Sequence, residues 1–198
     1  MLNLITKSEI RKKIILLLIY NPEDSFYINQ IARLVKTSAG NVQRELKKIE
    51  ESGLLSKEKK GNSLYFKINS ANPVFNDLKN IVDKTIGLKN ILEKILKKSK
   101  GIDFAFLFGS YVKRNFSATS DIDLYVIGDI SEKELHRLVK KSEEKIYREI
   151  NYHLSSREEF QKKTKKSFFY KEILQNFILL IGDQNEFRKF IKQTTERR

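Results

Sequence analysis

The feature that most constrains this chain is a pair of short apolar segments between positions 103 and 127. Residues 103–108 become apolar after their first position and end at Gly109-Ser110. Ten residues later, Asp121-Ile122-Asp123 leads into a second apolar segment, residues 124–127. Short apolar runs bounded by turn residues are typical of buried β-strands. The pattern therefore predicts two strands of one sheet, with a glycine-serine turn after the first and two aspartates at the start of the second.

These residue types favour phosphate and metal chemistry. Side chains two apart on a strand share a face, so Asp121 and Asp123 can hold the same metal cluster. Mg²⁺ prefers carboxylate and water oxygens, and two such ions can bind nucleotide phosphates and activate an attacking hydroxyl. Gly109 lets a phosphate approach the backbone, and Ser110 can donate its hydroxyl and amide. An isolated Asp-x-Asp is often a chance feature, but here the strand, the turn and the gap accompany it.

The stretch from Gly109 to Asp123 resembles the signature of the DNA polymerase beta-like nucleotidyltransferases, in particular the minimal nucleotidyltransferases of bacteria and archaea. The resemblance implies transfer of a nucleoside monophosphate from an NTP to a hydroxyl acceptor, with Mg²⁺ as cofactor and pyrophosphate released. Relatives usually carry Ala-Arg-Gly where this chain has Val112-Lys113-Arg114, so Lys113 keeps a positive charge for the triphosphate, while Arg114 replaces a glycine. Such proteins often act beside a small helical toxin partner, which implies a protein or RNA acceptor.

The family also uses a third carboxylate on a later strand. A helix over residues 131–145 leads to a strand over residues 148–154, on which Glu149 and Asn151 share a face. Glu149 is the candidate third ligand, and the predicted catalytic and metal set is therefore Asp121, Asp123 and Glu149. Many relatives carry aspartate here, and Glu149 as a plain surface charge remains an alternative. The two histidines show no metal-ligand spacing and receive no role.

The first half of the chain predicts three helices followed by two strands. The helices are expected near residues 8–20, 28–35 and 38–52, and the strands, joined by a basic hairpin, at residues 54–57 and 63–68. Gly53 is a typical residue for ending the third helix. This order resembles the winged helix-turn-helix of ArsR- and MarR-type regulators over residues 8–70. In that class, the third helix and the hairpin contact duplex DNA.

The distribution of charge supports a nucleic-acid partner. Residues 1–100 carry 20 Lys and Arg against 10 Asp and Glu, whereas residues 101–198 carry 19 against 15, within a net charge of +14. A concentrated positive field favours polyanions, because neutralised phosphates release condensed counterions. The predicted DNA-binding residues are Ser38, Gln43, Arg44, Lys47, Lys59 and Lys60. A winged helix that only binds another protein is the alternative.

Residues 72–98 carry a persistent apolar stripe and predict one long helix, or two with a break near Gly87. This segment is either a bridge between domains or a dimerisation helix, and a homodimer is expected in the second case. The predicted organisation is a winged-helix domain at residues 1–71, a connecting helix at 72–100 and a nucleotidyltransferase-like domain at 101–198. The fold class is α+β, with a mixed sheet in the second domain.

Composition excludes several classes of protein. No cysteine is present, so disulfides and Cys-ligated zinc are excluded. No apolar run reaches the ~18–20 residues that span a bilayer, and no signal-peptide pattern is found, so a cytoplasmic protein without a membrane partner is expected. The leading interpretation is a DNA-binding protein with an active nucleotidyltransferase domain. The alternative is a transcriptional regulator or antitoxin-like protein whose second domain is a nucleotide sensor or inactive.

Overall fold

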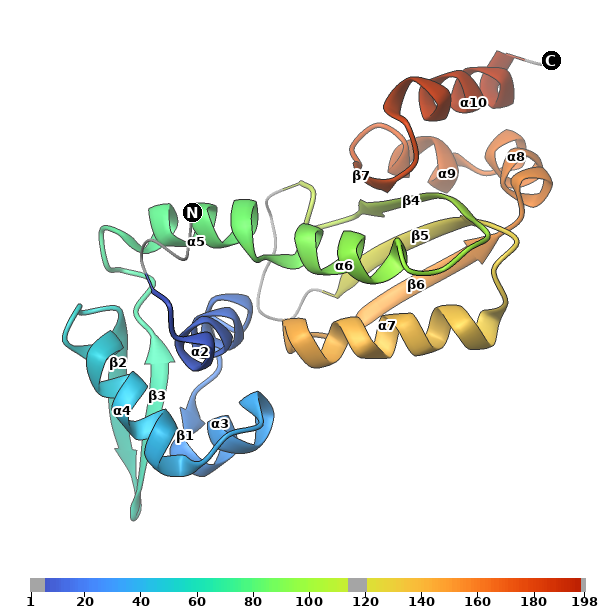
Figure 1. Ribbon diagram of the computed structural model, residues 1–198. Coiled ribbons are helices and arrows are strands. Elements are labelled where there is room, and N and C mark those ends of the chain that lie inside the picture. Colours follow the sequence, from blue (N-terminus) through green and yellow to red (C-terminus); the bar gives the residue numbers. More distant parts are fainter. Residues whose placement is uncertain (1–5, 114–120, 197–198) are drawn as a thin grey trace. The chain divides into compact units, whose positions relative to one another are not determined.

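The structure, a computed structural model, describes residues 6–113 and 121–196, the side chains of 194–196 excepted. The chain divides into two compact units (Figure 1). The N-terminal unit comprises residues 1–91 with 144–147, and the C-terminal unit comprises residues 92–143 with 148–198. Both combine helices with a sheet, so the predicted α+β class is confirmed.

The N-terminal unit is a three-helix winged helix. Its first elements are α2 (Glu9–Tyr20), β1 (Phe26–Tyr27), α3 (Ile28–Val35), α4 (Ala39–Glu50), β2 (Leu55–Lys60) and β3 (Ser63–Ile68). The strands form an antiparallel sheet in the order β1-β3-β2, and β2 and β3 make the predicted hairpin with a tight turn at Gly61-Asn62. The strand β1, which no sequence pattern predicted, pairs Phe26 with Phe66 and so connects the start of α3 to the sheet.

The helices of this unit form where the sequence predicts them. Ser8 caps α2 by accepting a hydrogen bond from the Arg11 amide at 3.2 Å. The inward side chains of α4 are buried: Val42, Leu46 and Ile49. Gly53 follows with a φ of 73°, a left-handed conformation that glycine adopts without strain, and the chain turns there into β2.

Residues 72–98 form two helices rather than one, α5 (Phe75–Thr85) and α6 (Leu88–Leu96). Tyr20 organises the break, because its hydroxyl donates to Asp83 at 2.6 Å and accepts from the Leu88 amide at 2.8 Å. Gly87 is required there, since a Cβ atom would lie 2.7 Å from the Cα of Asp83. The predicted break near Gly87 is therefore confirmed.

The C-terminal unit is built on a mixed four-stranded sheet. Its strands are β4 (Ile102–Phe108), β5 (Ile122–Gly128), β6 (Ile150–Ser155) and β7 (Ile178–Ile181), in the order β6-β5-β4-β7. Only the β5–β6 pair is parallel, and α7 (Glu132–Ile146) provides the crossover between these two strands. The helices α8 (Arg157–Lys166), α9 (Phe168–Ile173) and α10 (Gln184–Glu196) complete the unit.

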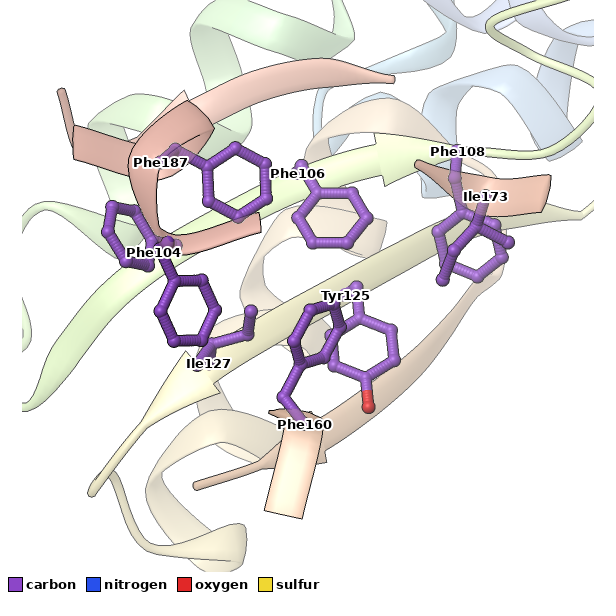
Figure 2. Close-up of a cluster of buried hydrophobic side chains, with 9 residues drawn as sticks. Phe104, Phe106, Phe108, Tyr125, Ile127, Phe160, Ile173 and Phe187 are labelled. Carbon is purple, nitrogen blue, oxygen red and sulfur yellow. The ribbon is translucent and has the colours of Figure 1, made fainter. Parts of the chain in front are cut away.

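One face of this sheet carries an aromatic core (Figure 2). Because strand residues alternate between faces, Phe104, Phe106 and Phe108 of β4 project to the same side. The ring of Phe106 stacks on that of Tyr125 from β5, with centroids 5.5 Å apart and planes 7° from parallel. Rings from α8 and α10 complete the core on this face of the sheet: Phe160, Phe187 and Phe190. This packed aromatic layer supports the sheet and so positions the ends of its strands.

No helix in the described part of the chain combines the length and the apolar character needed to cross a membrane.

Candidate functional site

The glycine-serine turn after β4 lies against an aspartate of β5. Gly109 has a φ of 74°, and a Cβ atom there would overlap the carboxylate of Asp123. Glycine is thus required twice, for its backbone conformation and for the close approach of the carboxylate. The turn continues as Lys113 donates its amide to the Gly109 carbonyl at 3.2 Å. Ser110 is half-buried within this turn, and Arg114 lies outside the described residues.

Asp123 is a half-buried carboxylate in the middle of three strands. In the sheet it pairs with Phe108 of β4 and with Asn151 of β6. Burial raises the pKa of Asp123, a hydrogen bond from the Asn151 amide lowers this pKa, and the charge of Asp121 raises it again. The net effect is a raised pKa.

Glu149 does not join this pair. It precedes β6, its side chain is exposed, and its carbonyl accepts the Ile122 amide at 3.4 Å. A hydrogen bond with Glu143 raises the pKa of Lys140 on α7, and the charge of Glu149 adds to that shift. Within residues 6–113 and 121–196, no three side chains of the His, Cys, Asp or Glu type are grouped to hold a metal ion.

The register separates Glu149 from Asp123. Glu149 and Asn151 share a face of the chain, but the parallel pairing aligns Asn151 with Asp123. Glu149 is then two residues, or roughly 6–7 Å, further back along the chain, level with Asp121. The residue beside Asp123 on β6 is therefore a neutral amide rather than a carboxylate.

A cavity of about 350 Å³ lies beside Asp123 and Asn151. Its lining has a polar part and an aromatic part: Gly109, Lys113, Asp123, Asn151, Glu172 and Asn176, with Phe108, His153, Phe169 and Ile173. The Lys113 ammonium pairs with the Glu172 carboxylate of α9 at 3.0 Å. The cavity thus brings together three of the predicted residues, Gly109, Lys113 and Asp123, whereas its lining does not include Ser110, Asp121 or Glu149.

His153 belongs to this site, although its sequence spacing indicated no role for it. It follows Asn151 by two residues on β6 and therefore shares the face of Asp123. Its ring stacks on Tyr125, with centroids 5.6 Å apart, and lies 5.9 Å from the ring of Phe108. The period-two alternation through Glu149, Asn151 and His153 was the signal that would have found it. For α9, which supplies Phe169 and Glu172, the sequence offers no comparable pattern.

A second candidate surface lies in the N-terminal unit. The side chains of Gln43, Arg44 and Lys47 are exposed along α4, opposite its buried face. Ser38 caps this helix by accepting the Asn41 amide at 3.3 Å.

The tip of the hairpin adds further positive charge to this unit. Lys59 and Lys60 are exposed beside the β2–β3 turn. The Lys60 ammonium pairs with Glu58 at 3.2 Å and lies 5.4 Å from the ring centroid of Tyr65. An ion pair between Lys57 and Glu50 joins β2 to α4. The helix α4 and the β2–β3 hairpin, the wing of this unit, are thus two exposed basic elements of one unit.

Comparison with known families matches residues 90–186, just under half of the chain, to the family described as Polymerase beta, Nucleotidyltransferase. A search of curated proteins finds no match. Similar solved structures include a toxin–antitoxin with AMP-PNP, at 20% identity and a TM-score of 0.42 over 54% of this chain and 82% of that one.

Another is the tri-AMPylated Shewanella oneidensis HEPN toxin in complex with MNT antitoxin, at 18% identity and a TM-score of 0.38 over 54% of this chain and 80% of that one. Reduced HlyU from Vibrio cholerae is similar at 13% identity, with a TM-score of 0.34 over 42% of this chain and 82% of that one.

Proposed function

We propose, from the polymerase beta type of nucleotidyltransferase domain at residues 90–186, that this chain transfers a nucleoside monophosphate from an NTP to a hydroxyl acceptor and also binds duplex DNA. The observation that carries the proposal is the single cavity lined by Gly109, Lys113 and Asp123. In the reaction, the acceptor oxygen forms a bond to the α-phosphorus, the bond to the β-phosphate oxygen breaks, and pyrophosphate leaves. The acceptor hydroxyl releases its proton to solvent.

The carboxylates of Asp123, which lines the cavity, and of Asp121, which is exposed just before β5, are ligands of the type that Mg²⁺ prefers. The raised pKa of Asp123 reflects burial and like-charge repulsion that a cation would relieve. We assign both aspartates as metal ligands. The bound ion would neutralise phosphate charge and polarise the reacting phosphoryl group.

The chain's own residues bind and orient the triphosphate. The absence of a side chain at Gly109 leaves the turn open to a phosphate, and Ser110 in the same turn can donate to it. Lys113 supplies a cation at the cavity, and it must exchange its partner Glu172 for a phosphate oxygen. This exchange costs little, because both side chains of the pair are about half exposed.

A specific observation favours a second candidate function. Asn151 stands beside Asp123, where a third carboxylate would strengthen the metal site. A site with two carboxylates and a neutral amide supports binding of an NTP more strongly than it supports activation of a nucleophile. In this case the domain is a nucleotide sensor, and the bound NTP alters the affinity of the winged helix for DNA.

DNA binding by the N-terminal unit is supported by two exposed basic elements on a three-helix fold with a wing. Helix side chains such as Gln43 and Arg44 can reach base edges in the major groove, whereas Lys59 and Lys60 suit phosphates. We expect affinity for duplex DNA to fall steeply as salt concentration rises.

The decisive experiment incubates the full-length protein with α-labelled NTPs, Mg²⁺ and a cell lysate separated into protein and RNA fractions. Transfer predicts a labelled macromolecule and released pyrophosphate, both lost in Asp123→Asn and retained in Asp129→Asn, a matched change at the exposed residue that follows β5. NTP binding without pyrophosphate release would favour the sensor. An absence of NTP binding would overturn both functions.

A further inference from the structure

Two adjacent phenylalanines of α9 are exposed to solvent. Phe168 is 76% exposed and Phe169 is 41% exposed, among the most exposed large apolar side chains of the described residues. Large aromatic side chains are enriched where a partner or ligand covers them, since leaving them in water forfeits apolar burial. Only Phe169 lines the cavity.

Phe169 is held in place by the aromatic wall of the cavity. Its ring centroid lies 6.0 Å from that of Phe108 and 6.2 Å from that of His153, both in edge-to-face arrangements. Ile173, one helical turn further along α9, is buried in the aromatic core and anchors the helix. The ring of Phe169 is therefore fixed in position while much of its surface remains accessible.

The lining of the cavity changes from polar to aromatic. Gly109, Lys113 and Asp123 suit a charged triphosphate, whereas Phe108, His153 and Phe169 offer flat ring surfaces. A nucleotide has the same two parts, because its phosphates carry charge and its base is a planar π-system. The cavity volume of about 350 Å³ lies within the range of sites that bury small ligands.

We infer that Phe169 forms the nucleobase subsite of this cavity, on which the base of the bound NTP stacks. This inference rests on the proposed function, since it assigns the base end of the same site. His153 provides the adjoining ring surface, and Asn176 adds an amide, with donor and acceptor, at the rim for the edge of the base. Purines, with the larger ring system, are held more tightly than pyrimidines.

The test measures dissociation constants of the full-length protein for ATP and for inorganic tripolyphosphate, both with Mg²⁺, by calorimetry. Phe169→Ala should weaken ATP binding by about 5- to 150-fold, the range that loss of base–aromatic stacking gives. Tripolyphosphate binding should not change, because it has no base. Phe169→Leu keeps apolar volume against Phe108 and should lose ATP affinity in the same way, whereas Phe169→Tyr should retain it.

Phe168→Ala is the matched control, because this neighbouring ring is more exposed but does not line the cavity. Its ATP affinity should equal that of the unchanged protein. The inference is overturned if Phe169→Leu leaves ATP affinity intact, or if it weakens ATP and tripolyphosphate equally. If the unchanged protein binds neither ligand, the proposed function itself fails. If the unchanged protein binds ATP and tripolyphosphate with equal affinity, the base subsite is rejected but the proposed function is not.

Discussion

The two units present their chemistry in opposite ways. In the N-terminal unit, the candidate residues are exposed on a helix and a hairpin tip, and none of Gln43, Arg44 and Lys59 is buried. In the C-terminal unit, the central candidate is a half-buried carboxylate whose pKa is raised by burial and by a second carboxylate. Exposed charges act through a field that salt screens, whereas half-buried ones act through their position. We therefore expect single substitutions on the exposed surface of the N-terminal unit to reduce binding in small steps. A substitution of the half-buried carboxylate in the C-terminal unit should instead cause a large loss.

The cores of the two units also differ in the type of side chain that they bury. The N-terminal unit buries mainly aliphatic side chains, such as Ile14, Leu17 and Leu18 of α2. The C-terminal unit buries a network of rings that reaches the cavity through Phe108. Aromatic rings have few rotatable bonds and preferred packing geometries, so this network gives the cavity a rigid wall.

The largest expected effect tests the positional role of the half-buried carboxylate. Asp123→Asn should reduce Mg²⁺-dependent NTP binding and pyrophosphate release by at least about 100-fold, because the carboxylate that we propose as a metal ligand loses its charge. DNA affinity should be unchanged. NTP binding is measured by calorimetry and pyrophosphate release by a pyrophosphate assay, each on the full-length protein.

The same variant should be at least as stable as the unchanged protein when EDTA is present. The raised pKa of Asp123 means that its charged form costs the folded state free energy at neutral pH. Asp123→Asn removes this cost, and the gain should shrink as pH falls through the raised pKa of the folded state and vanish below the ordinary value of 3.8. Thermal unfolding at pH 7 checks the sign, and a variant that unfolds would make the aspartate pair structural.

The second prediction tests whether the wing, the β2–β3 hairpin, contributes to DNA binding through its exposed positive charge. Reversing both charges, Lys59→Glu with Lys60→Glu, should weaken binding to all duplex sequences by about 10- to 100-fold at low salt. The slope of log affinity against log salt concentration should fall by about two, since two phosphate contacts are lost. The matched control reverses Lys165 and Lys166, which are exposed on α8 and change the net charge equally. Equal weakening by the control would mean that the wing has no special role.

Local pattern was sufficient to predict much of both units. The buried face of α4 followed from the spacing of Val42, Leu46 and Ile49, because a helix repeats every 3.6 residues. The turn at Gly109 and the strand at Asp123 followed from a short motif whose parts are close in the chain.

The remainder of the site depends on contacts between distant segments. Whether Glu149 or Asn151 faces Asp123 is decided by the register of a parallel strand pair, and both residues fit the same local alternation. The short elements β1 and α9 carry no periodic signal, since two and six residues do not complete a pattern. Their formation rests on packing, and α9 brings Phe169 and Glu172 to the cavity only through the fold.

The third prediction concerns the ion pair that holds α4 in the N-terminal unit. Glu45 accepts hydrogen bonds from the Arg11 guanidinium at 2.7 Å and from the Ser8 hydroxyl at 3.0 Å. Burial alone would raise the pKa of Glu45, but these two hydrogen bonds and the charge of Arg11 lower it below its ordinary value of 4.5. Glu45→Gln should therefore cost roughly 1–2 kcal/mol of stability at pH 7.

A lowered pKa also fixes the pH dependence of this effect. The stabilisation is complete above the ordinary pKa of 4.5 and is lost as pH falls through the lower pKa of the folded state. The difference in stability between the unchanged protein and Glu45→Gln should shrink only in that acidic range. Denaturant unfolding at several pH values measures it, with Glu51→Gln, an exposed change just after α4, as the control. A constant difference across pH would contradict the assignment.

The smallest expected effect tests whether an exposed charge at the cavity behaves like one at the wing. Lys113 and Glu172 are each about half exposed, so their ion pair at 3.0 Å contributes little to folding. Glu172→Gln frees Lys113 for the triphosphate and removes a negative charge from the lining of the cavity. NTP affinity should therefore rise by about two- to fivefold, and the gain should shrink with added salt. In the background of Lys113→Gln the gain should fall, because the freed ammonium is missing. A gain of the same size in both backgrounds would show that Glu172 acts only by repelling phosphate, and the partner exchange of Lys113 would then be wrong.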